Sequence, residues 1–327
     1  MRKGIFMRKT SEFMLKYADR ITERDFNASK SDYGKLLIIA GSQGMAGAAF
    51  LSGLAAFRSG IGMVRYFGPE CNRTVLQTLL PEAMYDPDGS ASEEDAVNVD
   101  KLNKALDWAD YLICGPGLST GRRAESIIDA LFSADLSGKK LVLLDADALN
   151  RIASENRSIA ALNSKRNIES GGTNIVITPH VGEMRRLTGR SVPEIKADPA
   201  GCAAAYAKEQ QCTVVLKDAV SYVAFPDGSV FENDSGHASM AKAGSGDVLT
   251  GVIAGLTAVT GAGASEGAAA GDFVHGKAGE LAAAYLGEHS LLARDIADAV
   301  SGVIGSESYK YDGIFEDYEE GSQETEQ

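Results

Sequence analysis

The stretch MAKAGSGDVLTGVIAGL, which begins at Met240, places one carboxylate at the start of an apolar helix. Glycine lets a ligand approach the backbone closely, and the first N–H groups of a helix attract phosphate oxygens because they have no partner inside the helix. We therefore expect Gly244, Ser245 and Gly246 to form an anion hole. Asp247 would then take the proton of an attacking hydroxyl. An acid in a first helical turn can also serve only to stabilise the helix, so this alternative stays open.

A second glycine-rich motif, GPGLSTG from Gly115, follows an expected strand and precedes an expected helix. It is close to the G-x-G-x-x-G pattern of dinucleotide-binding proteins, but its third glycine is one place late. Asp145 ends the next expected strand, roughly where such proteins place a ribose-binding acid. A Rossmann dehydrogenase is therefore an alternative at this point.

Three further polar motifs follow expected strands. They contain His180 and Glu183 in TPHVGE, Lys217 in VVLKD, and Asp145 and Asp147 in DAD. Each residue has an ordinary structural explanation, as a satisfied histidine, a helix-start acid or a surface lysine. Magnesium often needs only one or two carboxylates beside phosphate oxygens, which makes Asp145 and Asp147 candidates to hold it through water.

The elements around these motifs alternate between short apolar runs and helical segments. Strands are expected in KLLIIAG, GMVRYF, DYLICG, KLVLLD, NIVIT and TVVLK, and a hairpin around Pro226-Asp227-Gly228. This alternation predicts an α/β domain with a mostly parallel sheet that helices cover on both faces. Ligands of such sheets bind outside the carboxyl ends of the strands, so we expect all five motifs to meet in one cleft. Helices are expected last at Asp247–Val259, Ser265–Leu286 and Ala293–Ile304.

Composition limits the possible partners. The 327 residues carry 32 basic and 45 acidic side chains, for a net charge of −13, which disfavours nucleic acid and anionic membranes. The four cysteines include no C-x-x-C pair, which fits a reducing compartment, and no signal peptide or membrane span is evident. We expect a cytoplasmic protein with a helical lead-in at residues 1–28, one domain at 29–304, and an acidic, disordered tail at 305–327.

Several motifs together resemble one family. GKLLIIAGSQGMAGAAF, ICGPGL, DADALN, ITPHVGEMRRLTG, VVLK and AGSGDVLTGVIAGL are similar to the ADP-dependent NAD(P)H-hydrate dehydratases of the ribokinase-like superfamily, from about Ser29 to Ile304. The resemblance implies a three-layer α/β/α ribokinase-like fold. It also implies repair of hydrated NADH or NADPH (the S epimer): the ring hydroxyl is phosphorylated by ADP or ATP with Mg²⁺, and elimination of phosphate restores the double bond, giving AMP and phosphate when ADP is used.

The resemblance also implies roles for individual residues. Asp247 would be the catalytic acid and would contact the hydrate together with Ala48, Gly117 and His180. Apart from the resemblance, Asp145 and Glu183 are the candidates to hold magnesium through water. The nucleotide would be bound by Gly246 and by the five consecutive residues Lys217, Asp218, Ala219, Val220 and Ser221.

The chain departs from the family pattern at two places. Asp218 stands where glycine is usual and should repel a polyphosphate. In the second stretch Lys242 stands where threonine is common, and His237-Ala238-Ser239 replaces the usual N-P-G turn. Two alternatives stay open: a small-molecule kinase of the same superfamily, acting on a vitamin precursor or sugar, which the GSGD site would also serve, and an inactive nucleotide-binding relative, which Asp218 and the altered turn suggest. We expect a homo-oligomer, for which a tetramer is one candidate form.

Overall fold

The computed structural model describes residues 8–163 and 174–305, and the expected acidic tail lies outside them apart from Gly305. Its centre is one ten-stranded sheet in the order β1-β10-β9-β8-β7-β6-β5-β2-β3-β4. Neighbouring strands are parallel except in the pairs β8–β9 and β9–β10. The strands are β1 (Arg8–Lys9), β2 (Lys35–Ile39), β3 (Met63–Gly68), β4 (Met84–Pro87), β5 (Tyr111–Cys114), β6 (Leu141–Leu144), β7 (Ile175–Ile177), β8 (Thr213–Leu216), β9 (Tyr222–Ala224) and β10 (Val230–Glu232).

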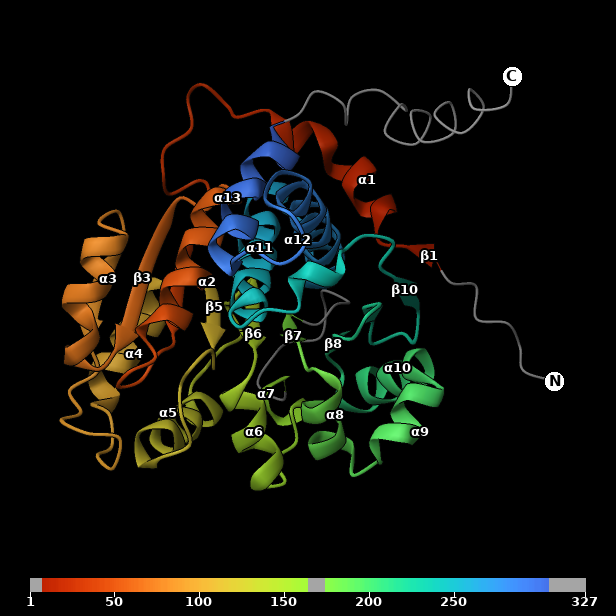
Figure 1. Ribbon diagram of the computed structural model, residues 1–327. Coiled ribbons are helices and arrows are strands. Elements are labelled where there is room, and N and C mark those ends of the chain that lie inside the picture. Colours follow the sequence, from red (N-terminus) through yellow and green to blue (C-terminus); the bar gives the residue numbers. More distant parts are fainter. Residues whose placement is uncertain (1–7, 164–173, 306–327) are drawn as a thin grey trace, which may run out of the picture.

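Helices cover both faces of this sheet (Figure 1). One layer contains α1 (Ser11–Thr22), α2 (Ala46–Arg58), α11 (Ser245–Thr260), α12 (Ala264–Leu286) and α13 (Ala293–Ile304), and α3 (Arg73–Leu79) packs beside α2. The opposite layer contains α4 (Val99–Trp108), α5 (Arg122–Ser133), α6 (Asp147–Ser154), α7 (Ala160–Asn163), α8 (Val181–Thr188), α9 (Val192–Ala197) and α10 (Pro199–Gln210).

The pleat of each strand divides the core between the two layers. Leu36 and Ile38 of β2 pack against the layer of α11 and α12, whereas Leu37 and Ile39 pack against the layer of α5 and α6. All four are fully buried, because successive side chains of a strand point to opposite faces and both faces are covered. The predicted three-layer α/β/α architecture with a mostly parallel sheet is confirmed.

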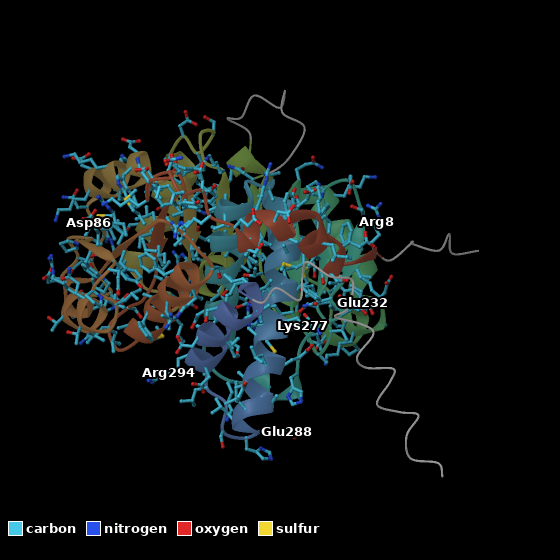
Figure 2. All side chains as sticks on the ribbon, turned by 90° about the horizontal axis from the view of Figure 1, so that it is seen from above. Arg8, Asp86, Glu232, Lys277, Glu288 and Arg294 are labelled. Atoms are coloured by element: carbon cyan, nitrogen blue, oxygen red, sulfur yellow. The ribbon has the colours of Figure 1, made fainter. Side chains whose placement is uncertain are left out.

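The hairpin at Pro226-Asp227-Gly228 is also as expected: β9 and β10 pair antiparallel, and the backbone N–H of Phe225 donates to the carbonyl of Ser229. The last three helices match their predicted ranges to within two residues. Figure 2 places Arg8 of β1 and Asp86 of β4 at opposite ends of the sheet, and Glu288 at the tip where α12 turns toward α13.

Several elements were not foreseen from the sequence. The edge strand β4 is short and ends in Pro87, which cannot donate to a strand ladder. Helices α9 and α10 carry signals that could have located them, namely a capping box between Ser191 and Glu194 and an N-cap at Asp198. Helix α1, by contrast, lies within the predicted helical lead-in, and it packs Phe13 and Met14 into the core that α12 helps to form. No helix of the described residues is long and apolar enough to cross a membrane.

The sheet reverses its direction of winding between β2 and β5. From β2 the chain continues outward to β3 and β4, and then returns to β5 on the other side of β2. Doubly wound sheets bind ligands at such a switch point, outside the carboxyl ends of the strands. Dinucleotide-binding folds share this winding, so the strand order alone does not distinguish a dehydrogenase from a ribokinase-like enzyme.

Candidate active site

An ion pair between Asp145 and Lys217 forms the centre of the site. Asp145 follows β6 and Lys217 follows β8, and Nζ of Lys217 lies 2.8 Å from Oδ1 of Asp145. The hydroxyl of Thr178, which follows the intervening strand β7, donates to the same oxygen at 2.7 Å. Three neighbouring strand ends thus converge on one carboxylate that is only 2% exposed.

Lys217 is a component of this centre and not a surface lysine. Burial opposes the charge on its ammonium group, but the nearby carboxylates of Asp145 and Glu183 outweigh that effect and raise its pKa. The lysine therefore supplies a permanent positive charge at the carboxyl edge of the sheet.

Asp247 lies in the first turn of α11, close to this pair. Its pKa is raised to about 7, mainly by burial and further by the negative charge of Asp145, while Lys217 acts in the opposite direction. A carboxyl group with a pKa near neutrality is suited to accept a proton at physiological pH.

The turn before Asp247 contains the predicted anion hole, but the N–H of Ser245 already donates to the carbonyl of Lys242 at 3.3 Å, which leaves Gly244 and Gly246 as the candidates. Gly244 has a φ of 95°, and a Cβ there would lie 2.5 Å from Leu51, so only glycine fits. A Cβ on Gly246 would lie 3.2 Å from Nζ of Lys217, so the start of α11 faces the lysine directly. Ser245 anchors the turn by donating its hydroxyl to the carbonyl of Met240 at 2.7 Å.

Ala48 and Gly117 come together on the other side of Asp247. Gly117 has a φ of 58°, and a Cβ there would lie 2.9 Å from Cβ of Ala48. The hydroxyl of Ser52 lies 3.1 Å from the backbone oxygens of both Ala48 and Asp247, which joins α2 to the start of α11. These two predicted hydrate-binding residues are thus adjacent to each other and are connected to Asp247.

His180 and Glu183 form the start of α8. Nδ1 of His180 accepts from the backbone N–H of Gly182 at 2.9 Å, and the buried carboxylate of Glu183 accepts from the N–H of His180 at 2.8 Å. Partial burial, followed by the charge of Lys217, holds the pKa of His180 below its usual value, while burial raises the pKa of Glu183. The half-exposed imidazole of His180 therefore lies at the carboxyl edge of the sheet, where the backbone of His180 pairs with that of Lys217, and the lowered pKa favours its neutral form.

The predicted nucleotide segment is an exposed loop from Lys217 toward β9. Asp218, Ala219 and Val220 are exposed, and the backbone carbonyl of Ser221 accepts from the N–H of Asn233 at 2.9 Å. The carboxylate of Asp218 lies 3.5 Å from Nζ of Lys196 on α9. Its negative charge therefore has a local counterion. That counterion is not Lys242, which donates to the carbonyl of His289 at 3.1 Å.

A magnesium ion at this site would be held mainly by phosphate oxygens, and the acidic residues would only assist. Within residues 8–163 and 174–305, no group of three or more His, Cys, Asp or Glu side chains is arranged to hold a metal by itself. Asp145 uses Oδ1 for Lys217 and Thr178, which leaves Oδ2 toward Gly246. Asp147 instead accepts from the backbone N–H of Ser119 at 2.8 Å. Glu183 likewise accepts from the N–H of His180, so Asp145 is the carboxylate with an oxygen left toward the start of α11, and a role of Glu183 through water stays a prediction.

Two features of the site escaped the sequence analysis. Thr178 is fully buried, and nothing in the motif TPH indicates that its hydroxyl serves Asp145. Ala146, between the two aspartates of DAD, has a φ of 48°, a conformation that non-glycine residues rarely adopt and that occurs preferentially at functional sites.

Comparisons with known proteins agree with this geometry. A family model described as NAD(P)H-hydrate dehydratase matches residues 36–301. The ADP-dependent (S)-NAD(P)H-hydrate dehydratase of Bacillus subtilis (strain 168) is 33% identical over 278 residues, which cover 85% of this chain and 91% of that protein. The bifunctional NAD(P)H-hydrate repair enzyme of Moorella thermoacetica is 36% identical over 286 residues, which cover 85% of this chain and 51% of that protein. The chain thus spans about half the length of the bifunctional relatives it matches.

Solved structures give the same result. A Bacillus subtilis ADP/ATP-dependent NAD(P)H-hydrate dehydratase, co-crystallised with ATP/Mg²⁺, superposes with a TM-score of 0.74 at 31% identity and covers 92% of this chain and 98% of that one. A ribokinase-like superfamily protein from Enterococcus faecalis superposes with a TM-score of 0.73 at 23% identity, covering 88% and 93%, which shows the shared fold. The ribokinase-like fold is confirmed, and the Rossmann dehydrogenase is set aside.

Proposed function

Because the chain belongs to the NAD(P)H-hydrate dehydratase family, we propose that it restores hydrated NADH and NADPH to the reduced cofactors, with ADP as the phosphoryl donor. The observation that carries this proposal is the position of Asp247. Its carboxyl group, with a pKa of about 7, lies in the first turn of α11, between the predicted hydrate-binding residue Ala48 and the Asp145–Lys217 pair.

The chemistry follows from these positions. Asp247 takes the proton from the ring hydroxyl, whose oxygen attacks the β-phosphorus of ADP and displaces AMP. The N–H groups of Gly244 and Gly246 would hold the transferred phosphoryl group, since that of Ser245 donates to the carbonyl of Lys242, and Lys217 adds a fixed positive charge beside Gly246. A bound Mg²⁺ ion, held through water by Asp145 and Glu183, would neutralise phosphate charge.

The second step is an elimination. Phosphate is a far better leaving group than hydroxide. The lone pair of the ring nitrogen expels the phosphate, and the ring carbon next to the one that carried it then loses a proton. The ring double bond is restored, and the balance is one hydrate plus ADP giving one reduced cofactor, AMP and phosphate. His180, neutral and at the edge of the cleft, together with Ala48 and Gly117, would line the space for the nicotinamide ring.

The test is an assay with hydrated NADH in which ADP and ATP are supplied in parallel. We expect the near-ultraviolet absorbance of the reduced nicotinamide to return, with one AMP and one phosphate per turnover in the ADP reaction. Nucleotide binding without any phosphate release would support the inactive relative. ATP-dependent phosphorylation of an alcohol, without recovery of NADH, would support the small-molecule kinase.

The setting of the protein is part of the same proposal. All four cysteines are free thiols, which suits a reducing cytoplasm. Light scattering of the purified chain would test the expected homo-oligomer, including the tetramer.

A further inference from the structure

A buried arginine contacts both glycine turns at the switch point, the one after β2 and the one after β5. Arg123, in the first turn of α5, is 0% exposed, and its Nε lies 2.5 Å from Oδ2 of Asp88, which is also 0% exposed. The other oxygen of Asp88 accepts from the N–H and the hydroxyl of Ser90 at 2.9 and 2.7 Å. The sequence analysis did not single out this pair.

The remaining donors of Arg123 reach backbone carbonyls on both sides of the switch point. Nη1 lies 3.1 Å from the carbonyl oxygen of Gly41, directly after β2, and 3.4 Å from that of Leu118, after β5. The N–H of Gly41 donates to the carbonyl of Pro116 at 2.8 Å, so the two turns also contact each other. One guanidinium group therefore bridges the turns GSQG and GPGL, in addition to their direct hydrogen bond.

The same arginine anchors a third segment. The backbone N–H of Arg123 donates to the carbonyl of Glu93 at 2.9 Å, and Nη1 lies 3.7 Å from Oε2 of Glu93. Oε1 of Glu93 accepts from the N–H of Gln43 at 3.1 Å, which holds the turn after β2 from outside. Among the described residues, Nη2 of Arg123 and Oε2 of Glu93 are buried without a hydrogen-bond partner.

A buried ion pair is weak evidence for stability, because well-packed apolar side chains of similar size often do as well. An apolar side chain could not, however, bind two carbonyls, a carboxylate and a neighbouring loop at the same time. The two turns it joins lead to Ala48 and Gly117, which meet so closely that an added Cβ would lie 2.9 Å from its neighbour. A small change in the spacing of these turns would therefore alter the surface between them.

We propose that Arg123 is a positioning residue that sets the width of the hydrate pocket between the turns that carry Ala48 and Gly117. This inference rests on the proposed function, because it assigns those turns to the nicotinamide hydrate. The predicted nucleotide contacts lie elsewhere, because Lys217 follows β8 and Gly246 is in the first turn of α11. Loss of Arg123 should therefore impair binding of the hydrate and leave binding of ADP unchanged.

Two variants test the proposal. Arg123→Lys keeps the charge but cannot reach Asp88 and both carbonyls together. The double variant Arg123→Met with Asp88→Asn removes both charges of the fully buried pair, and leaves only the partly exposed Glu93 without its distant cation. We expect the KM for hydrated NADH to rise by at least about tenfold, since small misplacements of a binding surface have large effects. The Kd for ADP, measured by calorimetry, should change by less than about twofold, because the predicted nucleotide contacts are not displaced.

Arg65→Met is the matched control. Arg65 pairs with Asp86 at 2.9 Å between β3 and β4, so this variant also loses an arginine ion pair but touches neither turn. It should lower the melting temperature and leave both constants unchanged. Should the double variant fail to fold, Arg123→Lys decides the question.

Two results separate the inference from the proposed function. If the wild-type protein is active but the Arg123 variants keep its KM for the hydrate, the inference alone is wrong. The same holds if the variants lose affinity for hydrate and ADP equally. A wild-type protein that neither binds nor converts the hydrate overturns both. A rise in the KM for the hydrate with ADP binding intact supports both.

Discussion

The ammonium group of Lys217 and the carboxylate of Asp145 form an ion pair of 2.8 Å, although 72 residues separate them in the sequence. Both act on Asp247, and they act in opposite directions. Burial raises the pKa of Asp247 most, the negative charge of Asp145 raises it further, and the positive charge of Lys217 lowers it. The ionisation of Asp247, and with it the activity at a given pH, therefore depends on its burial and on the balance between these two residues.

The pH dependence of the wild-type reaction follows from this arrangement. Asp247 has a pKa of about 7 and must be ionised to accept a proton, so kcat/KM should fall about tenfold per pH unit below that value and level off above it. Steady-state rates measured at constant ionic strength with ADP would show it. A profile that stays flat between about pH 5 and 8 would contradict a catalytic base with a raised pKa.

Substitutions of the ion pair should move this profile in opposite directions. Lys217→Met removes the charge that lowers the pKa of Asp247, so the acid limb of the profile should shift to higher pH. Asp145→Asn removes the charge that raises it, so the limb should shift to lower pH. Lys196→Met, which removes an exposed lysine on α9, is the control and should not shift it. Shifts of equal sign in the first two variants would refute the electrostatic account.

The stability of the folded protein should also depend on pH through Asp247. The pKa of Asp247 in the folded protein, about 7, lies above the usual 3.8, so folding favours the protonated acid. The corresponding stability is complete below about pH 4 and is lost as the pH rises through about 7. Asp247→Asn cannot ionise, so its melting temperature should exceed that of the wild type at about pH 8 and match it near pH 4. Calorimetry at both pH values measures the difference; a less stable variant at the higher pH would contradict the assignment.

The sequence predicts the architecture well because burial on both faces leaves a clear pattern. Leu36 to Ile39 form an uninterrupted apolar run that only a doubly covered strand explains, and the strand ends that follow such runs position Asp145, His180 and Lys217 at one edge. The short strand β4, by contrast, has no such pattern, because it lies at the edge and ends in proline.

The partners of the site residues could not be predicted in the same way. Lys217 reaches Asp145 across β7, and the sequence records only that both follow strands. Arg123 stands in the polar context STGRRAES, which suggests solvent exposure, yet it is buried completely because Asp88 and the carbonyl of Gly41, both from distant segments, bind its guanidinium group. Such contacts depend on tertiary packing and are not a property of local sequence.

The unusual aspartate of the nucleotide loop gives another test. The sequence alone indicates that Asp218 repels ADP, but its pairing with Lys196 at 3.5 Å offsets that charge. We therefore expect Asp218→Gly to change the Kd for ADP by less than about twofold, because an exposed pair contributes little. Lys196→Ala should weaken ADP binding more, since it leaves the aspartate without a counterion. Calorimetric titrations of both variants and the double variant would decide, and a large gain in affinity from Asp218→Gly alone would show that the pair does not screen the charge.

The most direct test of the central claim is the turnover of Asp247→Asn with ADP and hydrated NADH. Asparagine keeps the size of the side chain but cannot accept the proton of the ring hydroxyl. Since a positioned general base contributes about 10²–10⁴-fold, kcat should fall by at least about a hundredfold. The Kd for ADP should stay near the wild-type value, because the amides of Gly244 to Gly246 are unchanged. Turnover near the wild-type rate would contradict the account, since Asp247 would then be only a helix-start acid.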